Sequence, residues 1–319
     1  MAFWPSERGT LRGWRTGAQQ DHGKPVWRDW ERLIHATLPL VNDPPVIIAM
    51  TEGKHYKENG YGPALTAAKF LSATLGRCYD VRVGWHRSGD YGPAIFFDSS
   101  AVCLEFWGTK HRTVPRHWRN VADFTVRGDT TNLFRIALDH YDFQDGDVRL
   151  REAKNKGFLA NQKDDYGNPI RTLYLLDANG TAPGTVTSGG HLPDRDWSKA
   201  PRKTRLHKAI QGDDGVWRAD TRAMATLVGE WNGTGRDGGA GFVPLCETAH
   251  FDQGMPAERA FIPTVNSVGG DQIMNDWVLS ANWPHGLVRD SWTIHVPPAG
   301  QAPESWPSDH RVQSWAMLV

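Results

Sequence analysis

Cysteine is scarce in this sequence. Only Cys78, Cys103 and Cys246 occur, and no two of them have the spacing of a C-x-x-C pair. This scarcity argues against a disulfide framework and against a cysteine-ligated zinc site. We therefore expect a reducing, cytoplasmic setting.

Long apolar runs and an excess of one charge are also missing. The first eight residues lack the apolar core of a signal peptide, and no later stretch approaches the roughly 18 apolar residues that span a bilayer. The 36 basic and 36 acidic side chains balance, so no overall field holds the chain on nucleic acid or membrane. Any phosphate recognition must be local, and we expect a monomer without membrane contact.

The remaining composition is that of a folded protein. A hydrophobic content of 39% is enough for a sizeable core. Because α/β sandwiches of roughly 200 to 300 residues often fold as one unit, we interpret residues 1–319 as a single domain. Residues from about 182 to 264 are rich in Gly, Asp and Trp and weakly periodic, which indicates an elaborated insertion.

Helical and strand patterns are interspersed along the chain, which predicts an α/β fold. Amphipathic helices are predicted over 27–38, 63–75 and 147–162. Strands are predicted over 46–50, 81–85, 94–97, 102–107, 121–127, 133–138, 172–176, 276–280, 291–296 and 312–318.

Acidic, amide and imidazole side chains stand at the carboxyl ends of several of these strands. The residues are Glu52, His140, Asp177 with Asn179, and Asp309 with His310 before the last strand. Strand ends at one edge of a sheet face a common crevice, where ligand sites concentrate. The set is rich in oxygen donors, which suits Mg²⁺ or Mn²⁺ better than zinc.

Five segments, in order, resemble the motifs of the endonuclease/exonuclease/phosphatase superfamily of DNase I-like phosphoesterases. Residues 45–52 resemble the strand that ends in a metal-binding Glu, and 134–140 the strand that ends in a His. Residues 175–179 resemble "GDFN", with Leu in place of Gly, and 275–280 resemble "RIDYIxVS". Ser308-Asp309-His310 matches the terminal "SDH" unchanged.

The resemblance implies a four-layered α/β sandwich, with two mixed sheets packed face to face and flanked by helices. It also implies a Mg²⁺-dependent hydrolase of phosphate esters. We expect a nuclease-like phosphodiesterase acting on nucleic acid. The alternatives are a phosphatase on a small phosphorylated or lipid-derived substrate, and a catalytically dead binding module.

The resemblance also implies a role for each site residue. Asp177 would position or deprotonate the attacking water, and Asn179 would orient it. His310, oriented by Asp276, would contact the scissile phosphate, and His140 would stabilise the transition state. Glu52 and Asp309 are the expected metal ligands.

Basic residues outside these motifs are candidates for substrate binding. They are Arg149, on the helix after His140, and Lys203 and Arg205, in a basic run of the insertion. Such a run either holds a polyanionic substrate or forms a solvated surface.

Two features depart from the superfamily's pattern. We find no strand with a metal-site Asn before the helix predicted at 27–38. His191-Leu192 and Glu230 to Asn232 imitate the second and third motifs, at a similar separation. We reject this competing pair because Glu replaces the motif's Asp, and because 221–228 has the periodicity of a helix rather than a buried strand.

Overall fold

The computed structural model describes residues 2–4, 44–51, 53, 56–86, 92–108, 119–265, 273–283, 286–296 and 310–318. The helix expected over 27–38 and the expected metal ligands Glu52 and Asp309 lie outside these described residues. Within them, no helix has the length and apolarity that crossing a membrane requires.

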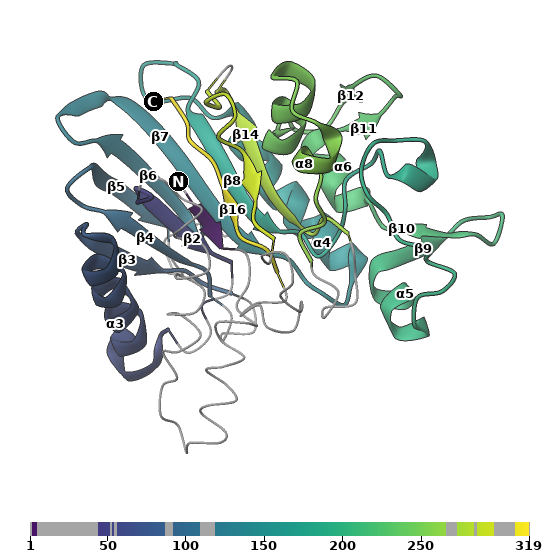
Figure 1. Cartoon of the computed structure of the whole chain (residues 1–319), viewed down its shortest axis with the longest axis horizontal. Coiled ribbons are helices and arrows are strands. Elements are labelled where there is room, and N and C mark those ends of the chain that lie inside the picture. Colours follow the sequence, from purple (N-terminus) through teal and green to yellow (C-terminus); the bar gives the residue numbers. More distant parts are fainter. Residues whose placement is uncertain are drawn as a thin grey trace.

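Two six-stranded sheets form the centre of the molecule (Figure 1). The first has the order β15 (Thr293–Ile294), β16 (Gln313–Ser314), β1 (Ala2–Trp4), β2 (Ile47–Met50), β4 (Ala94–Asp98) and β3 (Tyr79–Val83). The second has the order β13 (Val243–Pro244), β14 (Asp276–Ala281), β8 (Arg171–Asp177), β7 (Asp129–His140), β6 (Val121–Val126) and β5 (Val102–Gly108). Both sheets mix parallel and antiparallel pairs, because β1–β2 and β7–β8 are parallel and the other pairs are antiparallel.

Strand β2 shows how the layers arise from sequence. All four of its residues are buried, and side chains alternate between the faces of a strand. Ile47 and Ala49 belong to the core between the two sheets. Ile48 and Met50 belong to a second core beneath helix α3 (Glu58–Leu75).

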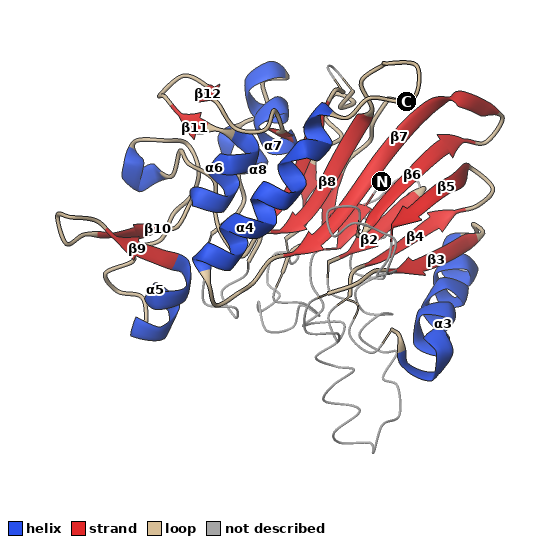
Figure 2. Cartoon of the chain, turned by 180° about the vertical axis from the view of Figure 1, so that it is seen from behind, coloured by secondary structure: helices blue, strands red, loops and turns tan. Residues whose placement is uncertain are grey.

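Helices cover the outer face of each sheet, which gives four layers. Figure 2 shows α3 beside the first sheet and α4 (Gly146–Lys156) lying across the second. Asp145 caps α4 by accepting hydrogen bonds from the backbone N–H groups of Asp147 and Val148. The described structure is therefore the sandwich that the motifs implied.

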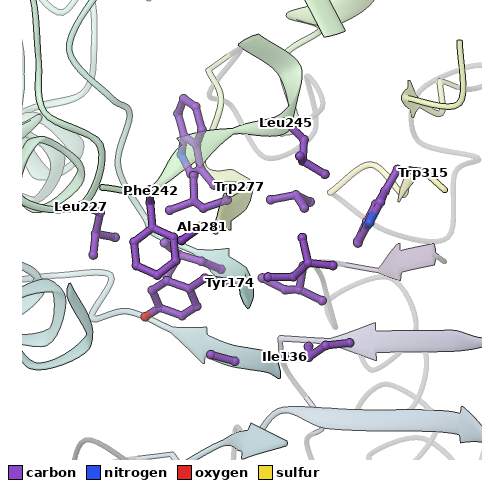
Figure 3. Close-up of a cluster of buried hydrophobic side chains, with 14 of the residues drawn as sticks. Ile136, Tyr174, Leu227, Phe242, Leu245, Trp277, Ala281 and Trp315 are labelled. Carbon is purple, nitrogen blue, oxygen red and sulfur yellow. The ribbon is translucent and has the colours of Figure 1, made fainter. Parts of the chain in front are cut away.

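The core of the second sheet continues on both of its faces. Tyr174 of β8 points toward Phe242 and Leu227, the latter from helix α6 (Arg222–Val228), while Trp315 lies on the opposite side of the cluster from Leu227 (Figure 3). The ring centroids of Tyr174 and Phe242 are 5.7 Å apart.

The segment between β8 and β14 contains several short elements. These are η4 (Val186–Ser188), α5 (Arg202–Lys208), β9 (Ala209–Gln211), β10 (Trp217–Ala219), α6, β11 (Glu230–Trp231), β12 (Arg236–Asp237), β13, α7 (Leu245–Glu247), η5 (Thr248–Asp252) and α8 (Ala257–Ala260). Helix α6 confirms the helical periodicity predicted over 221–228.

Several expected boundaries were wrong. The helix expected over 147–162 divides into α4 and the 3₁₀ helix η3 (Gly157–Asn161). The strands expected over 291–296 and 312–318 shrink to the two-residue strands β15 and β16. Strand β1, between β2 and β16, was not predicted, because three residues before a proline give no periodic signal. It contains no Asn, so it does not contradict the expectation that an Asn-bearing metal-site strand is missing.

Candidate active site

Three neighbouring strands place three of the predicted residues in one row. Asp177, at the end of β8, pairs with His140 across the parallel β7–β8 ladder. It pairs with Asp276 across the antiparallel β8–β14 ladder. Directly opposed residues project from the same face of a sheet, so the three side chains lie side by side.

The row lies where the two sheets meet. Leu175 and Val278 are two residues from Asp177 and Asp276, on the same face of the second sheet, and belong to the core between the sheets. The row therefore continues the intersheet core to its edge, where apolar side chains give way to polar ones. The side chains of His140 and Asp177 keep 8% and 4% of their surface exposed.

A tight turn directs the amide of Asn179 toward this row. The backbone N–H of Asn179 donates to Asp177 Oδ1 at 2.9 Å, and Asn179 has a positive φ of 47°, which Asn tolerates better than most residues. The Asx turn that this sequence favours is thus present and holds the site residues. It leaves Asp177 Oδ2 facing His140 Nε2 at 3.4 Å.

Asn179 and His86 flank the imidazole of His140. Asn179 Nδ2 lies 3.0 Å from the carbonyl oxygen of Tyr141, which only accepts, so this atom is the amide nitrogen. The same nitrogen lies 3.2 Å from His140 Nε2. His140 Nδ1 faces His86 Nε2 at 3.4 Å.

His86 was not predicted from the sequence. Together with His140 it borders a cavity of about 140 Å³ that is also lined by Trp85, Arg119 and Glu152. The Arg119 guanidinium stands 4.5 Å above the Trp85 ring. The cavity offers room beside the row for one arm of a phosphate ester.

His310 joins the row from the other sheet. It precedes β16, and its Nδ1 lies 2.8 Å from Asp276 Oδ2. Thr264 holds the two segments together, because its hydroxyl accepts from the backbone N–H of Asp276 and its carbonyl accepts from the backbone N–H of Arg311. The predicted pairing of His310 with Asp276 is present in the structure.

Asp276 is fully buried, and burial raises the pKa of its carboxyl group. The imidazole of His310 opposes this rise in pKa, and the Asp177 carboxylate adds to it. Asp276 Oδ1 is buried without a hydrogen-bond partner in the described structure. Asp177, Asp276 and His310 each offer one ligand atom, all within 4.8 Å of one another. This oxygen-rich set with an unused buried oxygen fits a divalent cation such as Mg²⁺.

A buried polar network that was not predicted from the sequence supports the end of β7. Asp139 accepts from Asn120 Nδ2 at 3.1 Å and from the Tyr174 hydroxyl at 2.9 Å, and pairs with Lys156 Nζ at 3.1 Å. Asn120 also exchanges hydrogen bonds with the backbone of Trp85, next to His86. Asp139 therefore does not pair with His140. It anchors the strand end from the helix-covered face.

The three basic residues predicted to bind substrate lie in different surroundings. Arg149 is 1% exposed, with its guanidinium directed at the carbonyl groups of Asp142 and His207. This corrects the expectation of direct substrate contact. The Arg205 guanidinium stands 5.5 Å above the Trp217 ring and donates to the Ser198 carbonyl, whereas Lys203 is exposed.

The competing motif pair belongs to a different cluster. His191 Nε2 lies 2.9 Å from Glu247 Oε1, and Arg236 pairs with the same carboxylate. Although burial opposes it, hydrogen bonds from His191 and Arg236 lower the pKa of Glu247. Glu230 is exposed on β11. Neither His191 nor Glu230 is among the described contacts of Asp177 or Asp276.

Comparison with known proteins supports the fold but gives no close relative. No protein-family model matches the chain, and no curated protein does. Among solved structures, it is similar to ANGEL2, a 2′,3′-cyclic phosphatase, with a TM-score of 0.52 and 14% identity over 92% of this chain and 86% of that one. It is also similar to a humanized D. rerio TDP2, with a TM-score of 0.51 and 13% identity over 100% of this chain and 98% of that one. For a truncated Caenorhabditis elegans TDP2 the TM-score is 0.50 and the identity 11%, over 100% of this chain and 97% of that one. The chain has a DNase I-like fold.

Proposed function

We propose that this protein is a nuclease-like phosphodiesterase that uses Mg²⁺ or Mn²⁺. The observation that carries the proposal is the row of His140, Asp177 and Asp276, which His310 joins from the other sheet. Two imidazoles and two carboxylates at a crevice, on a DNase I-like fold, suit the hydrolysis of a phosphate ester.

Asp177 is our candidate for the group that activates water. Its Oδ1 accepts from the backbone N–H of Asn179, so Oδ2, which lies 3.4 Å from His140 Nε2, is our candidate for the oxygen that contacts water. A carboxylate fixed in this way orients a water molecule and accepts its proton as the water attacks phosphorus. The amide of Asn179 lies at the same point of the row and would orient the phosphate.

The two histidines act on the charge of the phosphate. Hydrolysis accumulates negative charge on the phosphate oxygens, and donors already in place offset it. The His310 Nδ1–H group donates to Asp276 Oδ2 at 2.8 Å, which orients the imidazole, and Nε2 would donate to the substrate. Asp276 is thus a positioning residue, and His140 would donate from the opposite end of the row.

A divalent cation would be held by carboxylates. Glu52 and Asp309, which lie outside the described residues, remain the proposed ligands. A bound cation supplies electrophilic stabilisation of the phosphate oxygens.

Turnover of a generic diester tests the proposal. We expect the purified protein to hydrolyse bis(p-nitrophenyl) phosphate and plasmid DNA when Mg²⁺ or Mn²⁺ is present, and to stop on chelation. Full activity after chelation would contradict the metal-dependent mechanism. Absence of turnover with both substrates and both metals would contradict the hydrolase itself.

A phosphatase is the second candidate, and the similarity to ANGEL2, a 2′,3′-cyclic phosphatase, favours including it. The same assay with p-nitrophenyl phosphate and with 2′,3′-cyclic AMP separates the two. A kcat/KM for either substrate that exceeds the value for the diester would favour the phosphatase.

A further inference from the structure

Residues 195–219, called the basic lobe below, form a small unit with a core of its own. Trp197, Ala200, Ala209 and Ala219 pack with Ile273, and Trp217 adds to them. Figures 1 and 2 show its elements α5, β9 and β10 on the opposite side of the molecule from α3. Because the lobe is packed, its surface side chains stand on a fixed support.

Charge is concentrated in this lobe. It contains seven basic side chains, which are Arg195, Lys199, Arg202, Lys203, Arg205, Lys208 and Arg218. Against them stand only three acidic ones, Asp196, Asp213 and Asp214. The lobe thus has a formal charge of +4 in a chain of net charge zero, so the remainder has −4. The neutral total conceals a local positive field.

Two of these cations are available to a ligand. Lys199 pairs with Asp196 at 3.0 Å and Arg218 with Asp214 at 2.5 Å. Arg202 and Lys203, in contrast, are exposed at the start of α5, and neither has an acidic partner among the described residues. Helix α5 itself contains no acidic residue.

The base of the lobe is attached to the active-site turn. Arg149 Nη2 donates to the carbonyl of His207, the next-to-last residue of α5, at 2.8 Å and lies 3.5 Å from Asp220 Oδ2. The backbone carbonyl of Asp220 in turn lies against Gly180, where an added methyl group would meet it at 3.4 Å. Gly180 directly follows Asn179, so Arg149 fixes the lobe next to the catalytic row.

We propose that the basic lobe is a second substrate-binding surface that holds backbone phosphates of a polynucleotide beside the scissile one. The inference rests on the proposed phosphodiesterase and names its substrate as a chain of nucleotides rather than a small ester. The buried Arg149 has a positioning role here, holding the lobe in place instead of touching substrate.

Binding measured without turnover tests the lobe independently of catalysis. The probe is a fluorescein-labelled 20-nucleotide oligothymidine, followed by anisotropy in EDTA from 50 to 200 mM NaCl. For Arg202→Gln/Lys203→Gln we expect a Kd at least about fivefold higher at 100 mM NaCl. The slope of log Kd against log salt should fall by about 1.4, since each lost phosphate contact removes about 0.7 for a single strand.

A matched control removes two cations elsewhere. Lys69 of α3 and Lys163, before the start of β8 and so at the end of that strand away from Asp177, are both exposed. Lys69→Gln/Lys163→Gln changes the net charge equally, and we expect its Kd to stay within about twofold. An equal loss of binding in both double variants would overturn the proposal that the basic lobe binds phosphates, and would indicate an effect of net charge instead.

Turnover of bis(p-nitrophenyl) phosphate separates the two proposals. This diester has no flanking phosphates, so Arg202→Gln/Lys203→Gln should keep its kcat/KM within about twofold of the parent protein. No turnover by the parent protein would overturn the proposed phosphodiesterase activity, whereas an unchanged salt slope would overturn the proposed role of the basic lobe.

Leu206, Ile210 and Val216 are exposed nearby. Impaired binding to phosphatidylserine vesicles with unimpaired oligonucleotide binding would therefore also overturn the lobe.

Discussion

At the scale of single residues, the site is built from side chains that use one polar atom for structure and keep the other for chemistry. Asp177 Oδ1 holds the turn and Oδ2 faces His140. His310 Nδ1 contacts Asp276 Oδ2, which orients the imidazole ring. The structural contact orients each side chain, and the second polar atom is kept for chemistry. Substitutions of Asp177 or His310 should therefore affect turnover more than folding.

Asp177→Ala should lower kcat at least about a hundredfold, because it removes both the base and the acceptor that shapes the turn. Glu230→Ala, at the competing motif, should change kcat less than twofold, since Glu230 is exposed on β11. Steady-state hydrolysis of bis(p-nitrophenyl) phosphate measures both. The reverse ranking would show that the wrong motif was chosen.

His310→Ala and Asp276→Ala should be strongly non-additive. If Asp276 works by orienting His310, removing the imidazole already removes most of what the carboxylate contributes. We expect each single variant to lose on the order of 3 to 5 kcal/mol of transition-state stabilisation, and the double variant to be little worse than His310→Ala. Circular dichroism checks that the fold is kept. Multiplicative losses would instead indicate an independent role for Asp276, such as metal binding.

The sequence predicted the residues of the row because short motifs mark them, but it did not predict their support. Asn120, Lys156 and Asp139 meet from three elements, and their contacts form only in the folded chain. Lys156 lies in the last turn of a helix rich in basic residues, where a solvated side chain is the usual expectation. No local sequence pattern distinguishes Lys156 from such a solvated side chain. Arg149 was misassigned for the same reason.

At the scale of elements, the long buried strands were predictable and the short ones were not. Strand β8 is buried at six of its seven positions, so its apolar run is continuous in the sequence. Strands β15 and β16 pair through two residues each, and their ends are set by contacts with Thr264 and Asp276 rather than by propensity. Tertiary contacts therefore decide their length.

His295, just after β15, should make this edge of the first sheet sensitive to acid. It is 2% exposed, and burial lowers its pKa from 6.5 to about 4. A lowered pKa in the folded state gives stability that is present above pH 6.5 and is lost as the pH falls through about 4. The loss should be on the order of 3 kcal/mol.

Urea unfolding at several pH values measures this contribution. His295→Gln keeps a polar partner for Ser314, whose hydroxyl lies 2.7 Å from His295 Nε2, but cannot be protonated. We expect the difference in unfolding free energy between the two proteins to change between pH 6.5 and 4. A constant difference would mean that His295 is protonated equally in the folded and unfolded states.

At the scale of the whole molecule, Arg149 joins units that are distant in sequence. Its guanidinium contacts the loop after β7, the end of α5 and Asp220. Asp220 also pairs with Arg222 through contacts of 2.8 and 2.9 Å. Loss of Arg149 would therefore remove a donor from two half-buried backbone carbonyl groups, those of Asp142 and His207, but would not leave an uncompensated carboxylate.

Arg149→Ala should lower the free energy of unfolding by on the order of 3 kcal/mol, from lost packing and unmet carbonyls. Arg151→Ala is the matched control on the same helix, because Arg151 is exposed, and it should cost less than about 0.5 kcal/mol. Urea unfolding measures both. Equal stability of the two variants would contradict the role of Arg149 as a buried connector.

Side chains alternate along a strand, so one residue inserted into or deleted from β8 would turn Asp177 from the crevice to the helix-covered face. The same holds for His140 on β7 and Asp276 on β14. The segment between Asn179 and Asp276 lies outside these three strands. Over evolution, changes in chain length should therefore accumulate in that segment, where whole elements such as α5 are gained or lost. Substrate preference would diverge there while the three strands keep their length.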